Sequence, residues 1–133
     1  MKRFFLLGVI TLTIGVFSIL SQTAYAGIAY NSRVVPVYAG TGTFYHDSNT
    51  YSNTFSRYEY IHVKMRTYKQ WLGWGTKVKT GEYKRGYAHT WRAHVGITRT
   101  YGPGYWARTV GNHYWRTYGG TRIFRSSATS WIW

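Results

Sequence analysis

Hydrophobic and polar positions alternate along most of the chain after residue 26, and no stretch there has the spacing of an amphipathic helix. The clearest alternation runs from Tyr58 to Tyr68, where Ile61, Val63 and Met65 share one face. Aromatic and β-branched residues dominate these stretches, as is typical of strands. The pattern predicts an all-β fold, either an antiparallel β-sandwich or a small barrel of short strands.

Two polar or glycine-containing stretches interrupt this alternation. Residues 46–57 are rich in Asp, Asn, Ser and Thr, which predicts a loop. Gly111-Asn112 predicts a break between one strand over 105–110 and another over 113–118. We therefore expect several short strands in this part of the chain.

Gly119-Gly120 is typical of a tight two-residue hairpin turn. In the register that such a turn favours, Trp115 lies opposite Phe124 and Arg116 lies opposite Ile123. An aromatic pair across two strands would help to fix this register.

Residues 1–26 have the order of a secretory signal peptide. Lys2 and Arg3 precede an uncharged, mostly apolar run from Phe4 to Leu20, and Ala24-Tyr25-Ala26 offers the small-x-small cleavage site. We expect cleavage after Ala26, secretion, and one cationic, aromatic-rich β domain over residues 27–133. The alternative is an uncleaved membrane anchor, for which the apolar run is short.

Composition narrows the chemistry of this domain. The chain has 17 Lys and Arg against 3 Asp and Glu, a formal net charge of +14, and no cysteine. So few carboxylates argue against a calcium site or a two-metal centre, and the lack of cysteine removes disulfides and thiol chemistry. Because the five histidines have no metal-ligand spacing, we expect neither a metal site nor a cofactor.

The core must be built largely from rings, because aliphatic residues are scarce whereas the chain has 14 Tyr and 7 Trp. Tyr and Trp carry polar groups that need partners, so many rings should be only half-buried. Cations interleave with these rings on nearly every expected strand, and such a surface attracts polyanions. The candidate binding residues are Tyr58, Tyr60, His62, Lys64, Arg66, Tyr68, Arg92, Arg108, Arg116, Trp131 and Trp133.

The chain ends in Ser130-Trp131-Ile132-Trp133, which is either a membrane-contacting tip or a last strand that closes the core. In composition the chain resembles small, cysteine-free, Gly- and Tyr-rich secreted bacteriocins of the lactococcin kind, which also end in an aromatic-rich strand. The resemblance implies an antibacterial role.

The function that these features favour is a secreted cationic binding protein that engages an anionic cell-envelope target. The target would be a membrane surface or a wall polymer, with nucleic acid bound in vitro and no membrane span left after cleavage. The composition favours this binding role over catalysis.

Two alternatives remain open. A small secreted ribonuclease could use Glu59 with His62, or Glu82 with His89 and Arg85, although Glu59 and His62 should face opposite sides of one strand. A passive matrix or coat component would bind without either activity.

Overall fold

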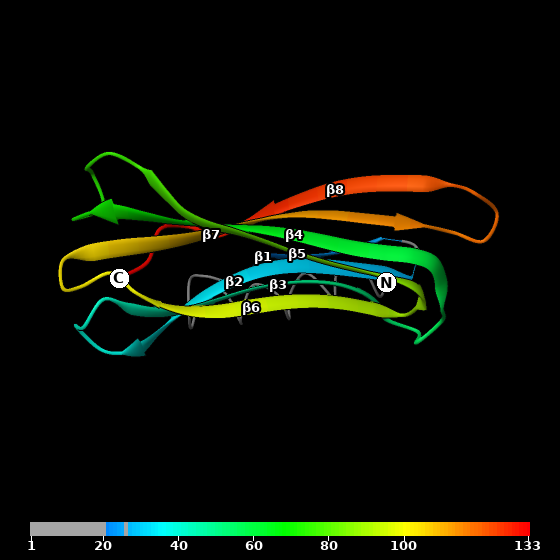
Figure 1. Cartoon of the computed structure of the whole chain (residues 1–133), viewed down its shortest axis with the longest axis horizontal. Helices are drawn as coiled ribbons and strands as arrows, with labels where there is room; N and C mark the ends of the chain where they lie inside the picture. The colour runs from blue at the N-terminus through cyan, green and yellow to red at the C-terminus, as the bar shows by residue number, and fades with distance from the viewer. Residues whose placement is uncertain (1–20, 26) are drawn as a thin grey trace, which may run out of the picture.

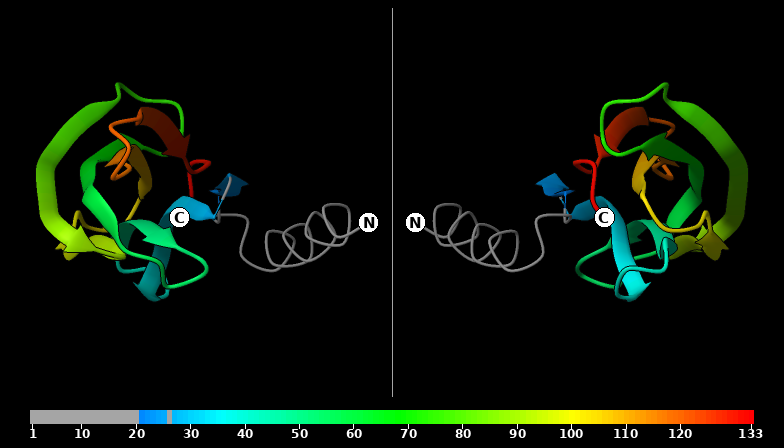
Figure 2. Two further views of the ribbon diagram at one scale, coloured as in Figure 1. Left: turned by 90° about the vertical axis from the view of Figure 1, so that its right-hand side faces the viewer. Right: turned by 90° about the vertical axis from the view of Figure 1, so that its left-hand side faces the viewer.

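Two four-stranded antiparallel sheets make up the fold (Figure 1). The computed structural model describes residues 21–25 and 27–133, and all the regular structure within these ranges is β-strand. Sheet A has the strand order β1-β2-β3-β6, and sheet B has the order β5-β4-β7-β8. Figure 2 shows the sheets curving around a common interior. The predicted all-β class is confirmed.

The strands of sheet A are β1 (Ser21–Tyr25), β2 (Ile28–Tyr38), β3 (Thr43–Ser52) and β6 (Arg92–Thr100). The strands of sheet B are β4 (Tyr58–Trp71), β5 (Val78–Thr90), β7 (Tyr105–Arg116) and β8 (Arg122–Ala128). The chain passes between the sheets after β3, after β5 and after β6. Consecutive strands elsewhere pair as hairpins within one sheet.

The predicted inner face of β4 is confirmed. Ile61, Val63 and Met65 are fully buried and pack in one cluster with Tyr30 of β2 and Trp115 of β7. Because this cluster joins both sheets, the alternation along β4 fixes which of its faces is left for solvent.

Residues 43–52 form the strand β3, so the prediction of a loop over 46–57 is wrong for its first half. After Phe44 the inward side chains of this stretch are polar, and His46, Ser48 and Thr50 are fully buried. Polar residues of this kind normally favour loops because a buried polar group needs a hydrogen-bond partner. Here those partners come from the facing sheet for His46 and Thr50, from Ser32 of the neighbouring strand β2 for Ser48, and from Tyr101 for His46.

One network of buried side chains links β3 to three other strands. Thr50 Oγ1 lies 2.8 Å from His113 Nδ1, and His113 Nε2 lies 2.8 Å from Ser127 Oγ. Ser32 Oγ lies 2.6 Å from Ser127 Oγ and 2.8 Å from Ser48 Oγ. The interior between the sheets is therefore partly polar and fully hydrogen-bonded along this chain of groups.

A second network surrounds His46. Its Nδ1 lies 2.7 Å from Thr109 Oγ1, and its Nε2 lies 2.9 Å from the Tyr101 hydroxyl. Burial lowers the pKa of His46 to about 3, and a repulsive contribution from Arg99 adds to the shift. Burial also lowers the pKa of His113 to about 3. Both imidazoles are therefore neutral at neutral pH.

β7 runs without interruption through Gly111-Asn112, so the predicted break is wrong. A Cβ atom on Gly111 would lie 2.4 Å from Ser32 Oγ and 2.9 Å from both Ser48 Oγ and His113 Nε2. Glycine is needed there because the side chains of Ser32 on β2 and Ser48 on β3 approach the backbone closely. The residue does not mark a turn.

The β7–β8 register differs from the predicted one by one residue. Trp115 pairs with Ile123 and Tyr114 pairs with Phe124, and the Thr117 amide donates to the Thr121 carbonyl at 3.0 Å. The connection is thus longer than a two-residue turn. This register directs Trp115 and Ile123 inward together. The predicted register would instead pair the buried ring of Trp115 with Phe124, which faces outward.

Most of the predicted signal peptide, residues 1–26, lies outside the described residues. Its segment Ser21–Tyr25 forms β1, which pairs with Ile28–Ser32 of β2. Cleavage after Ala26 stays a prediction. It would remove β1 and leave that part of β2 at the edge of sheet A.

Candidate anion-binding face

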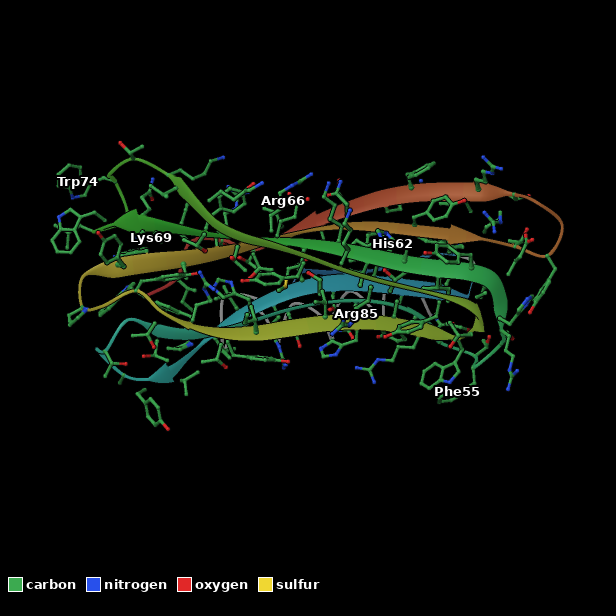
Figure 3. All side chains as sticks on the ribbon, in the orientation of Figure 1. Phe55, His62, Arg66, Lys69, Trp74 and Arg85 are labelled. Atoms are coloured by element: carbon green, nitrogen blue, oxygen red, sulfur yellow. The ribbon has the colours of Figure 1, made fainter. Side chains whose placement is uncertain are left out.

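The outer surface of sheet B gathers basic and aromatic side chains from four strands. Alternation along β4 places His62, Lys64 and Arg66 opposite the buried face, and His62 and Arg66 lie on this outer side in Figure 3. We call the following set the basic face: Tyr60, His62, Lys64, Arg66, Tyr68, Lys79, Glu82, Lys84, Arg108, Asn112, Tyr114, Arg116, Arg122 and Phe124.

Cations are crowded at the centre of this face. Lys64 lies directly opposite Lys84 in the β4–β5 register, an arrangement that like charges make unfavourable. Glu82 is the carboxylate nearest to them, with Lys79 Nζ at 2.9 Å, Lys64 Nζ at 3.3 Å and Arg66 Nε at 3.6 Å. Hydrogen bonds from Lys79 and Lys64 lower the pKa of Glu82 to about 2. One carboxylate shared by three cations leaves this region positive.

Arg116 and Arg108 are already engaged with the protein. Arg116 Nε donates to Glu59 Oε1 at 2.9 Å, and the guanidinium lies 5.6 Å from the centroid of the Tyr60 ring. The hydrogen bond to Glu59 raises the pKa of Arg116. Arg108 Nε donates to the Thr129 carbonyl at 3.0 Å. These arginines therefore have fixed positions at two sides of the face.

A depression of about 250 Å³ opens on the face beside the lysines, and His62, Lys64, Asn112, Tyr114 and Phe124 are among its lining residues. Partial burial lowers the pKa of His62, and the charges of Lys84 and Lys64 lower it further. The Tyr114 and Phe124 rings lie 4.7 Å apart between centroids and form one wall. The depression thus offers an ammonium, an amide and an imidazole beside an apolar wall, a combination that suits an anionic group.

Four of the predicted binding residues lie outside the basic face: Tyr58, Arg92 and the two C-terminal tryptophans. Tyr58 packs against the core cluster instead of joining the other side chains of β4. Arg92 lies on sheet A, where its Nη2 donates to Asn49 Oδ1 at 3.0 Å. It lines a depression of about 340 Å³ with Trp91 and Tyr51. The structure therefore brings together the β4 residues after Tyr58 with Arg108 and Arg116, and it separates Arg92 from them.

The C-terminal tryptophans lie at one end of the molecule, away from the middle of the basic face. Ala107 and Ile132 form an isolated bridge, and Ile132 packs against a small core cluster. Trp133 is 72% exposed, with its ring 6.0 Å from that of Trp106. Ile132 thus belongs to the core while Trp133 faces solvent, and contact of these residues with a membrane stays a prediction.

The carboxylate–histidine pairs considered for a nuclease do not form. Within the described ranges, Glu59 bonds to Arg116, Glu82 to lysines, and His89 to the Tyr118 hydroxyl at 2.9 Å. Over these same ranges there is also no cluster of His, Asp and Glu residues able to hold a metal ion.

Sequence reasoning missed one carboxylate–histidine pair. His94 Nε2 lies 3.6 Å from Asp47 Oδ2, and Arg33 Nη2 donates to the same oxygen at 2.9 Å. Asp47 and His94 lie on β3 and β6, and the sequence does not reveal this pairing because its polar composition predicts a loop over residues 46–57. Asp47 is buried beneath Arg33 and His94 and forms an ion pair with Arg33 on the outer side of sheet A.

Comparison with known proteins assigns no class to this fold and face. No family model matches the chain, and no curated protein matches it. A solved structure titled "pT26-6p" is similar at 14% sequence identity with a TM-score of 0.47, over 80% of this chain and 22% of that one. Nothing about function follows from so distant a likeness. The described residues contain no helix long and apolar enough to cross a membrane.

Proposed function

We propose that this protein is a secreted cationic binding protein that engages an anionic cell-envelope target through the basic face, and that it acts as an antibacterial effector. The observation that carries the proposal is the crowding of Lys64, Arg66 and Lys79 around the single carboxylate of Glu82, with Lys84 directly opposite Lys64. Cations this close together repel one another. Phosphates or carboxylates that bind with a similar spacing reduce this repulsion.

The shape of the basic face also supports a polyanion as the ligand. Its charges are spread over neighbouring strands of one sheet, so they match a repeating anion better than a single small one. The exposed ring of Phe124, packed on Tyr114, adds an apolar surface beside the charges. Headgroups at a membrane surface and the repeating units of an anionic wall polymer share this chemistry.

A charge-matched pair of variants tests the face. Lys84→Gln with Arg122→Gln removes two cations from the basic face, whereas Arg57→Gln with Arg92→Gln removes two from other surfaces. At low ionic strength the first variant should bind anionic vesicles or purified wall polymer about 30-fold more weakly, since each cation near an anionic surface contributes about 1 kcal/mol. The second variant should lose far less.

Vesicles and wall polymer are assayed separately by co-sedimentation with a chain that begins at Gly27. Binding to one alone identifies the source of the anion. Equal losses in the two variants would show that net charge, and not the basic face, drives binding. Retention that does not weaken with added salt would also contradict the proposal.

Activity assays separate the proposal from its alternatives. Purified protein is incubated with RNA and with sensitive bacteria, each with and without EDTA. Killing without RNA cleavage supports the proposal. Cleavage that is lost in Glu59→Gln or Glu82→Gln would favour the ribonuclease, and binding with neither effect would favour a matrix or coat component.

A further inference from the structure

Large apolar side chains are exposed together at one end of the two sheets, where the β2–β3, β4–β5 and β6–β7 connections meet the C-terminal residues. This end is at the left of Figure 1, and Trp74 projects from it in Figure 3. We call it the aromatic tip, and its members are between 42% and 74% exposed: Val37, Tyr38, Trp71, Leu72, Trp74 and Trp133.

Hydrogen bonds tie the connections of the tip to one another. The Tyr101 amide donates to the Gly42 carbonyl at 2.7 Å, and the Leu72 amide donates to the Gly104 carbonyl at 2.7 Å. A Cβ atom on Gly104 would lie 2.5 Å from the Trp71 ring, so glycine is needed where these turns touch. The tip is therefore a built surface that holds its rings in fixed positions.

Rings from different connections also contact one another. Trp71 meets Tyr105 edge-on with centroids 5.2 Å apart, and Trp106 lies 6.0 Å from Trp133. Trp71 and Trp133 nevertheless remain largely exposed, at 44% and 72%. These contacts orient the rings without burying them.

Leu72 is held in a conformation that leucine disfavours. Its φ is +52°, in the left-handed region that normally suits glycine or asparagine, and its side chain is 44% exposed. The folded chain thus carries backbone strain to display an aliphatic side chain next to Trp71 and Trp74.

The charged side chains next to the rings of the tip are lysines. Lys69 Nζ lies 4.6 Å from the centroid of the Tyr105 ring, and Lys77 Nζ lies 5.0 Å from that of Tyr68. Each of the chain's three Asp and Glu side chains lies in a strand among the described residues, and none is in the three connections that form the tip. Rings with lysines beside them match the interface of a bilayer that contains anionic lipids.

We propose that the aromatic tip inserts into the headgroup region of an anionic lipid bilayer, with Trp74 and Leu72 entering the apolar boundary and Lys69 and Lys77 meeting lipid phosphates. This site is separate from the middle of the basic face, so the inference stands independently of the proposed function. It also sets an orientation, because the long axis of the sheets points toward the membrane.

Single-cysteine labelling tests the insertion directly, because the chain has no native cysteine. Trp74→Cys and Phe55→Cys are each labelled with an environment-sensitive dye; the native side chains are 74% and 71% exposed, and they lie at opposite ends of the molecule (Figure 3). Phosphatidylglycerol-containing vesicles should shift the emission of the dye at 74 to the blue and leave the dye at 55 unchanged. Pure phosphatidylcholine vesicles should give a much smaller shift.

All variants in these vesicle experiments, including a full-chain version of Lys84→Gln/Arg122→Gln, are made in the full chain, so that any contribution of residues 1–26 to vesicle binding is common to them. A dye at 74 that stays in water while the protein is bound would overturn the inference. A shift of equal size at 55 would overturn it as well.

Leu72→Asn separates insertion from folding. Asparagine tolerates a positive φ, so the thermal midpoint should stay the same or rise, while the affinity for anionic vesicles should fall about fivefold. Phe55→Asn is the matched control, because Phe55 is also exposed and has φ +60°. Unchanged affinity in Leu72→Asn, or an equal loss in Phe55→Asn, would contradict the inference.

The Lys84→Gln/Arg122→Gln variant distinguishes failure of this inference from failure of the proposed function. Loss of affinity in that variant with a dye at 74 that stays in water supports the basic face and rejects the tip. A dye at 74 that enters lipid, with affinity unchanged by the two substitutions, supports the tip and rejects the basic face.

Discussion

At the scale of single residues, the most unusual feature is a pair of neutral histidines in the interior between the sheets. His46 and His113 are each hydrogen-bonded at both ring nitrogens, to Thr109 and Tyr101 in one case and to Thr50 and Ser127 in the other. A buried imidazole without partners would destabilise the fold, whereas one that is fully hydrogen-bonded helps to specify how two sheets align.

The stability of the fold should depend on pH through these two residues. The unfolded chain takes up a proton at each histidine below about pH 6.5, while the folded chain does so only near pH 3. Lowering the pH through this window therefore favours unfolding, by up to about 1.4 kcal/mol per pH unit for each histidine.

Urea unfolding at pH 7.5, 6.0 and 5.0 measures this dependence. The midpoint should fall steadily over the series, and it should fall equally in the control His89→Gln, which removes an exposed histidine. A midpoint that is constant from pH 7.5 to 5.0 would show that His46 and His113 are not buried as neutral groups.

At the scale of elements, β4 was predictable and β3 was not. Alternation identified both faces of β4, because its inner residues are hydrophobic and its outer ones are polar or aromatic. In β3 the inner side chains after Phe44 are histidine, serine and threonine, so from residue 46 onward the alternation shows no contrast in hydrophobicity. The partners that make these groups tolerable come from distant parts of the chain, and no local pattern reveals them.

The same reasoning explains how much of the candidate site the sequence revealed. It identified the β4 side chains from His62 to Tyr68, since they follow from the alternation alone. It offers Arg92 as a further candidate and does not identify Lys84, because the positions of both relative to β4 depend on which strands pair and in which register.

Gly111 offers a test of how closely β7 approaches sheet A. Gly111→Ala should destabilise the protein by about 1–3 kcal/mol, because the added methyl group meets Ser32 and Ser48 in a filled space. Gly119→Ala is the control, since its Cβ would have no neighbour closer than 3.7 Å. Similar thermal midpoints for the two variants would contradict the observed packing of β7.

At the scale of the whole molecule, the balance of positive and negative charge differs between the outer surfaces of the two sheets. The basic face shares one carboxylate among its central cations, whereas the outer side of sheet A holds Asp47 in an ion pair with Arg33. The aromatic tip lies at one end, next to the part of the basic face that contains Tyr68 and Lys79. Basic face and tip could therefore meet the same surface when the molecule tilts.

The protonation of His62 tests the central claim most directly, because this ring lines the depression on the basic face beside Lys64. A bound anion should offset the charges of Lys64 and Lys84 and raise the pKa of His62, measured by NMR with and without a short polyphosphate. The ring signals of His94, on sheet A, should stay unchanged. An unchanged His62 pKa at saturating polyphosphate, or a larger response at His94, would contradict binding at the basic face.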